Sequence, residues 1–176
     1  SAHLSIDVLT GVTNITDCLI GATGYTSGKG LFNAATVTYG TNDVTVTTNA
    51  CGDVPAFMVI DKTFLSASEP DADGLFLVSY AITVENTGGS TGTYDLSDTP
   101  NPDGNVLVDS ATVSGQASNS FATAGPYDLA TDEAIDAGET QTYFLDVSAH
   151  LSTDVLTGVT NITDCLIGAT GYTSGK

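Results

Sequence analysis

The sequence predicts an all-β protein built as an antiparallel β-sandwich, and three observations carry this prediction. Charged residues are only 14% of the chain, and Thr, Ser, Gly, Ala and Val fill much of the rest, which is typical of β-proteins rather than of helical or disordered ones. Apolar and polar residues alternate with a period of two over several stretches of strand length. Clusters of Gly, Pro, Asp and Asn separate these stretches at spacings that suit a sandwich.

The first predicted elements are two strands joined as a hairpin. Residues 31–39 and 43–50 are both extended segments rich in Thr, Val and Ala. Gly40, Thr41 and Asn42 lie between them and indicate the hairpin loop. The next strand is predicted over residues 56–65.

Three further strands are predicted over residues 74–86, 105–114 and 141–151. In the first of these, alternation places one set of side chains on the buried face: Phe76, Val78, Tyr80, Ile82 and Val84. In the last, the inward set is Tyr143, Leu145, Val147, Ala149 and Leu151. No helical periodicity of useful length is present.

The charge balance excludes two classes of partner. The chain has 21 acidic residues, three lysines and no arginine, and its net charge is -18. Such a surface repels nucleic acid and anionic membranes. No stretch approaches the roughly 18 apolar residues of a membrane span, so we predict no membrane insertion in this segment.

The sequence contains a long internal repeat. Residues 148–176 repeat residues 1–29 and differ only where Thr153 replaces Ile6, so the period is 147 residues. Near-identity over this length indicates tandem duplication, and a period of this size suits a self-contained domain better than a solenoid repeat. We expect the chain to be an excerpt of a tandem array.

Three segments together resemble a known family: YAITVENTGGSTGTYDLSDTP (80–100), AIDAGETQTYFLDV (134–147) and GLFNAATVTY (30–39). They are similar to the immunoglobulin-like "conserved repeat" domains of large bacterial and archaeal cell-surface proteins. The resemblance implies an immunoglobulin-like antiparallel β-sandwich, here with a unit of about 147 residues, and an extracellular or cell-surface location.

The order of elements in this family implies that the chain is out of phase with its domains. Residues 1–55 would be the C-terminal part of one repeat unit, and residues 56–176 the body of the next. Residues 30–55 would be the final hairpin. Three arrangements follow: the hairpin completes the same chain's body as a circular permutation, it is donated to a neighbouring chain, or the ends are simply the boundaries of the excerpt.

Two cysteines per period suggest one disulfide per exported domain. A Cys18–Cys51 bond closes a loop of about 33 residues. Because it lowers the entropy of the unfolded chain, such a bond should stabilise the fold by roughly 3–4 kcal/mol. Under the circular or donated arrangement, Cys51 pairs with Cys165 instead. The remaining alternative is buried free thiols, and zinc is not expected because no CxxC spacing occurs.

An internal isopeptide bond is a further hypothesis, taken from a resemblance to the isopeptide-forming sandwiches of bacterial surface fibres. There, a first-strand lysine attacks a last-strand asparagine with help from a buried acid. Lys62 and Asn33 hold the corresponding places, with Glu85 or Asp61 as the acid. The competing interpretation is a surface lysine and a hydrogen-bonded asparagine, and alternation points Glu85 outward.

Acidic loops suggest calcium as a candidate ligand. Asp71 and Asp73 place oxygen atoms on the glycine-containing loop 69–74, and residues 101–104 form a second such loop, although neither matches an EF-hand. Short Asp-Gly pairs are also ordinary turns. Asn14 and Asn161 begin Asn-Ile-Thr sequons and are candidate glycosylation sites.

The sequence therefore predicts a structural module that assembles with copies of itself in an extracellular stalk, surface layer or filament. No nucleophile elbow, metalloprotease motif or phosphate loop occurs, so an enzyme is not expected. The alternative is an adhesin-type module whose acidic loops bind calcium or a glycan. No resident cofactor is expected unless calcium is one.

Overall fold

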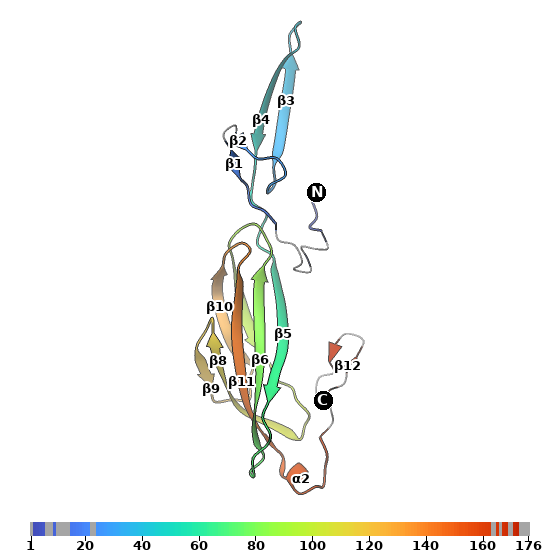
Figure 1. The fold of residues 1–176 in the computed structure, drawn as a ribbon, viewed down its shortest axis with the longest axis vertical. Coiled ribbons are helices and arrows are strands. Elements are labelled where there is room, and N and C mark those ends of the chain that lie inside the picture. Colours follow the sequence, from blue (N-terminus) through green and yellow to red (C-terminus); the bar gives the residue numbers. More distant parts are fainter. Residues whose placement is uncertain are drawn as a thin grey trace. The chain divides into compact units, whose positions relative to one another are not determined.

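The computed structural model describes residues 2–5, 9, 15–21, 24–162, 165, 167–168 and 171–172. Within these residues the protein is all-β, as predicted, with strands in several antiparallel sheets and a short helix, α2 (Thr153–Leu156), after the last long strand (Figure 1). None of the described helices has the length and apolar character needed to cross a bilayer. The chain divides into two compact units.

Unit 1 comprises Ser1–Ile60, Val84–Tyr94 and Ala134–Thr140. The predicted hairpin is confirmed: β3 (Asn33–Tyr39) pairs with β4 (Val44–Ala50), with Asn33 opposite Ala50 and Tyr39 opposite Val44. The loop between them turns through Gly40 at φ 76° and Asp43 at φ 51°. A smaller ladder joins β1 (Ile20–Gly21) to β2 (Gly24–Tyr25).

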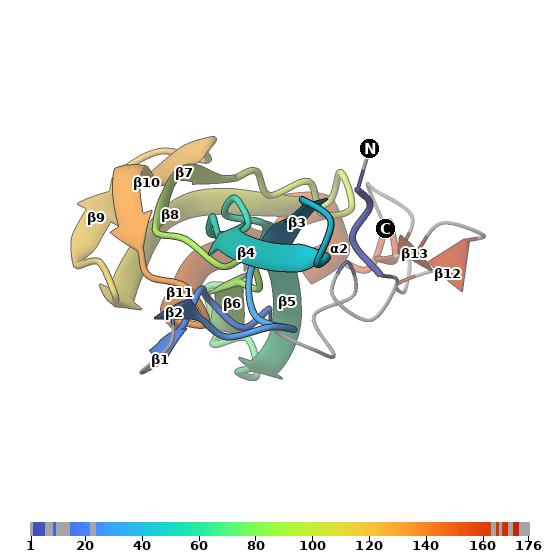
Figure 2. The same cartoon turned by 90° about the horizontal axis from the view of Figure 1, so that it is seen from above.

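The long strands form two further sheets (Figures 1 and 2). One has five strands, in the order β5 (Met58–Ala67), β6 (Leu75–Asn86), β11 (Thr140–Leu151), β8 (Val106–Gly115) and β9 (Asn119–Phe121). The other pairs β10 (Tyr127–Ile135) with β7 (Gly92–Asp98), and a small ladder joins β12 (Ile167–Gly168) to β13 (Gly171–Tyr172). The strands predicted over residues 56–65, 74–86, 105–114 and 141–151 are therefore confirmed.

Strands β7 and β10 were not predicted, because their sequences hide the period-two signal. In β7 a polar residue, Asp98, takes the buried position that follows Leu96. In β10 the alternation is interrupted by Asp132, which has a φ of 49° and whose backbone N–H donates to Asp95 Oδ1 at 2.8 Å. Segments in which polar residues occupy inward positions do not alternate visibly in sequence.

Unit 2 comprises Asp61–Thr83, Asp95–Glu133 and Gln141–Lys176 and contains most of the buried apolar residues. The predicted inward face of β11 is confirmed at Tyr143, Leu145, Val147 and Ala149, and Leu151 is half-buried. Both sheets contribute to the core, with Ile82, Ala111 and Val113 from the larger and Leu96, Tyr127 and Leu129 from the smaller. On β6, Phe76, Val78 and Tyr80 are half-buried, so this end of the predicted face is only partly covered.

Candidate functional site

A buried asparagine holds the linker in unit 1 by hydrogen bonds. The linker is residues 54–57, which follow the β3–β4 hairpin. Asn86 is fully buried. Its Oδ1 accepts hydrogen bonds from the backbone N–H of Phe57 at 3.1 Å and of Gly88 at 3.0 Å, and its Nδ2 donates to the carbonyls of Ser90 at 2.8 Å and Ile135 at 3.3 Å. Both ends of the amide are thus used, which removes the desolvation penalty of burying it.

The residues after Asn86 hold the same linker through backbone groups. The N–H of Thr87 donates to the carbonyl of Phe57 at 2.9 Å, and the N–H of Gly89 donates to the carbonyl of Val54 at 3.0 Å. A Cβ on Gly88 would lie 2.3 Å from the carbonyl oxygen of Pro55, so only glycine allows this approach. We call residues 86–90 the linker clamp.

The disulfide in the structure joins Cys18 to Cys51, with 5.9 Å between the Cα atoms. Around it, Gly30 has a φ of +49°, and a Cβ there would lie 2.7 Å from Cys18 Sγ. The backbone N–H of Cys18 donates to Asp53 Oδ1 at 3.0 Å. The base of the β3–β4 hairpin is therefore fixed covalently and by hydrogen bonds. Cys165, the repeat equivalent of Cys18, is exposed in unit 2.

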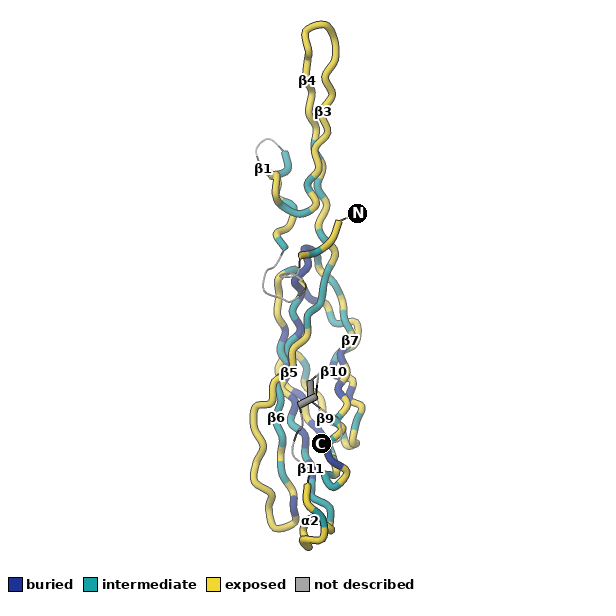
Figure 3. The backbone as a smooth tube through the Cα atoms, turned by 90° about the vertical axis from the view of Figure 1, so that its right-hand side faces the viewer, coloured by how far each residue is buried: buried dark blue, intermediate teal, exposed yellow. Residues whose placement is uncertain are grey.

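The β3–β4 hairpin has two chemically different faces, and both are exposed (Figure 3). Residues opposite each other in an antiparallel pair share a face, so Val37 with Val46 and Tyr39 with Val44 form an apolar face. These four side chains are 46–57% exposed. The other face carries threonines, whose hydroxyls bond across the strands from Thr36 to Thr47 at 2.9 Å and from Thr38 to Thr45 at 3.1 Å.

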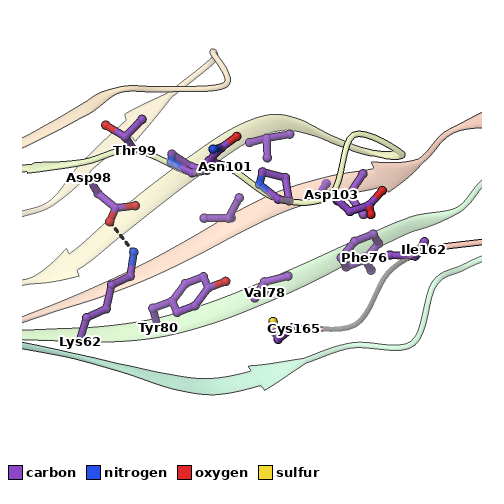
Figure 4. Close-up of a pocket in the computed structure, with 16 residues that line it drawn as sticks. Lys62, Phe76, Val78, Tyr80, Asp98, Thr99, Asn101, Asp103, Ile162 and Cys165 are labelled. Atoms are coloured by element: carbon purple, nitrogen blue, oxygen red, sulfur yellow. Dashed lines mark hydrogen bonds and ion pairs between the residues drawn. The ribbon is translucent and has the colours of Figure 1, made fainter. Parts of the chain in front are cut away.

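Unit 2 contains a groove of about 430 Å³ (Figure 4). Its apolar lining comes from β6, β8 and β11, and the residues around Asp98 supply polar groups. Residues of the C-terminal segment also line it. The lining includes Lys62, Phe76, Val78, Tyr80, Asp98, Asn101, Val147, Ala149, Ile162 and Cys165.

An ion pair lies at one end of this groove. Lys62 Nζ contacts Asp98 Oδ1 and stands 4.6 Å from the centroid of the Tyr80 ring (Figure 4). The Asp98 side chain is 10% exposed and that of Lys62 is 39% exposed. Burial, and then the negative charge of Asp98, raise the pKa of Tyr80 above its usual value. A cation between a carboxylate and an aromatic ring is stabilised by both.

The residues of the isopeptide hypothesis are divided between the two units, and Asp61, the alternative acid, is in unit 2 with Lys62. Lys62 is in unit 2, whereas Asn33 and Glu85 are in unit 1, and Glu85 is half-buried. The acid beside Lys62 is Asp98, which sequence reasoning missed. The sequence signal that could have identified Asp98 is its position two residues after Leu96, because alternate residues of a strand share a face and Leu96 faces inward in β7. The bond stays a prediction, and a mass deficit of one ammonia would reveal it.

The predicted calcium loop is built as a turn. Asp71 Oδ1 accepts from the backbone N–H groups of Asp73 and Leu75, both at 2.9 Å. Among the described residues, no group of three or more His, Cys, Asp or Glu side chains is placed to hold a metal ion. Calcium stays a prediction. Of the two sequons, Asn161 is exposed and Asn14 lies outside the described residues.

Comparison with protein-family models, with curated proteins and with solved structures finds no match.

Proposed function

We propose that the chain is a structural repeat module of an extracellular stalk, surface layer or filament, with an immunoglobulin-like β-sandwich as its unit. The observation that carries this proposal is the linker clamp. A hinge between independent domains needs no buried hydrogen bonds. Here, however, the buried Asn86 bonds to Phe57, and Gly88 lies close against Pro55 in the linker 54–57. Contacts of this kind stiffen a junction.

Three further features support a structural role. The 147-residue repeat indicates that the same junction recurs along a longer protein. The Cys18–Cys51 bond limits extension of the hairpin base under load. A net charge of -18 keeps an exposed array soluble. The proposed module is not an enzyme, and its partners are copies of itself.

Electron microscopy of a protein with several 147-residue periods tests the proposal. We expect straight rods with one axial repeat per period. Gly88→Ala, which forces the linker away from the clamp, is expected to give bent and variable rods, while Gly52→Ala, where an added Cβ has open space, keeps them straight. Chains of freely jointed beads in the wild type would contradict the proposal.

An adhesin-type binding module is the second candidate, and the groove in unit 2 favours it. Its volume of about 430 Å³ is within the range of small-molecule sites, and it combines Tyr80 with polar groups of Lys62, Asp98 and Asn101. Calorimetric titration with calcium and a panel of neutral and acidic glycans tests this alternative. Saturable binding that Lys62→Met abolishes would support it, and no heat with any ligand would count against it.

A further inference from the structure

We propose that the groove in unit 2 is the docking site for the β3–β4 hairpin of the following period of the same polypeptide. This inference rests on the proposed function, in which the 147-residue period recurs along a longer protein. The occupant is then a further copy of residues 33–50, which the repeat order brings after Cys165. Each period would be completed by the hairpin of the next.

The disulfide in unit 1 ties the base of the hairpin to the repeated segment. Cys18 belongs to the first copy of the repeat, and Cys51 directly follows β4, with 5.9 Å between their Cα atoms. Backbone hydrogen bonds add to this link. The N–H of Gly30 donates to the carbonyl of Thr16 at 2.7 Å. The N–H of Cys18 donates to Asp53 Oδ1 at 3.0 Å. The position of Cys18 therefore fixes the position of the hairpin base.

The second copy of the repeated segment brings this base to the groove. Cys165 holds the place of Cys18 in the next period, and Ile162 holds that of Ile15. Both Ile162 and Cys165 line the groove in unit 2 (Figure 4). A disulfide holds two Cα atoms within about 4–7 Å of each other. A bond from Cys165 to the next copy of Cys51 therefore sets the base of the next hairpin beside the groove.

The lining of the groove favours an apolar occupant. Six apolar side chains from β6, β8 and β11 contribute to it, and four of them are only half-buried. The half-buried four are Phe76, Val78, Val106 and Val108. Removing these side chains from water stabilises the fold, so a segment with an apolar face is the preferred cover.

The hairpin supplies such a face. A two-stranded hairpin by itself is marginally stable in water. Its exposed apolar face consists of Val37, Tyr39, Val44 and Val46. Within residues 33–50 the sole charged residue is Asp43, in the loop, so docking this face buries no charge. The opposite face suits water, because its threonine hydroxyls bond across the strands.

Hydrogen exchange of an extended chain tests the inference. The extended chain is the full chain followed by a second copy of residues 30–55, in the order that the repeat gives. We expect amide exchange in β8 and β11 to be at least about ten-fold slower than in the full chain, because the docked hairpin covers the groove side chains of these strands. The slowing should not depend on protein concentration, since hairpin and groove belong to one polypeptide.

Two substitutions in the appended copy form a matched pair. Val46→Asp there places a carboxylate on the apolar face and should abolish the slowing, because burying an unpaired charge is costly. Thr47→Asp there adds the same charge on the threonine face and should retain it. Neither substitution changes residues 1–176, so the sequence of unit 2 stays intact in both variants.

Peptide mapping of the oxidised extended chain gives an independent readout. Cys165 should be joined to the appended copy of Cys51, while Cys18 stays joined to the original Cys51. A Cys165 thiol would overturn the inference. A Cys165 bond without slower exchange in β8 and β11 would do the same, because it would show a tethered hairpin that does not dock.

Slower exchange that develops only at high protein concentration would also overturn the inference, since the occupant would then belong to another polypeptide. That failure is distinct from failure of the proposed function, which is judged from the straightness of the rods. Straight rods together with unchanged exchange in the extended chain would retain the structural role and remove the docked hairpin.

Discussion

Lys62 and Asp98 form an ion pair that joins β5 to β7, the neighbouring edges of two different sheets. The two partners are unequally buried, since the Asp98 side chain is 10% exposed and that of Lys62 is 39% exposed. The pair should therefore contribute more to the free energy of unfolding than a fully exposed salt bridge does. The stability lost on mutation should depend on which partner is replaced.

Lys62→Met is expected to lower the free energy of unfolding by about 1–3 kcal/mol, because it leaves the buried carboxylate of Asp98 without its cation. Asp98→Asn should cost less, since the more exposed Lys62 ammonium can be hydrated. Urea denaturation of both variants measures the difference. Equal losses would mean that the two groups are equally solvated.

Tyr127→Phe is expected to stabilise the protein by about 1 kcal/mol. Tyr127 is fully buried, and its hydroxyl has no hydrogen-bond partner among the described residues. Denaturation at neutral pH measures the gain. A destabilised variant would show that the hydroxyl is satisfied.

The same tyrosine predicts a loss of stability in alkali. Burial, followed by the charge of Asp98, raises the pKa of Tyr127 above 10.0. At pH values above about 10 the unfolded chain releases the phenolic proton more readily than the folded one, so the unfolded state is favoured. Tyr80 behaves in the same way. Thermal melts from pH 8 to 11 should show a fall that is shallower in Tyr127→Phe.

Asn86→Ala is expected to cost about 2–4 kcal/mol, because it leaves the carbonyls of Ser90 and Ile135 and the N–H of Phe57 without their buried partner. Gly88→Ala should cost about 1–3 kcal/mol through overpacking against Pro55. Gly52→Ala, just before the linker, is the control and should change stability by less than about 0.5 kcal/mol. Similar stabilities for all three variants would exclude a clamp.

Replacing both Cys18 and Cys51 by serine is expected to destabilise the hairpin base by about 3–4 kcal/mol. Hydrogen exchange should report the effect, because the β3–β4 ladder would lose protection while the β11 ladder keeps it. A reducing agent should have the same effect on the wild type. Unchanged exchange in β3 and β4 would show that hydrogen bonds alone hold the base.

Sequence reasoning succeeded where burial follows alternation. Along β11 the apolar side chains at every second position from Tyr143 to Ala149 are buried, and the β3–β4 pairing follows from the turn residues between the strands. It failed at β7, where the inward side chain is the charged Asp98. Here Lys62 from another strand pairs with this carboxylate, and no local pattern contains that information.

The sequence by itself determined the all-β class, the hairpin, the long strands and the 147-residue period. Period-two patterning, turn residues and direct repetition can all be read from the order of residues along the chain. The tertiary structure decided the linker clamp, the Lys62–Asp98 pair and the groove. Each of these depends on atoms from segments far apart in the chain, such as Asn86 with Phe57, and their approach is set by packing rather than by neighbouring residues.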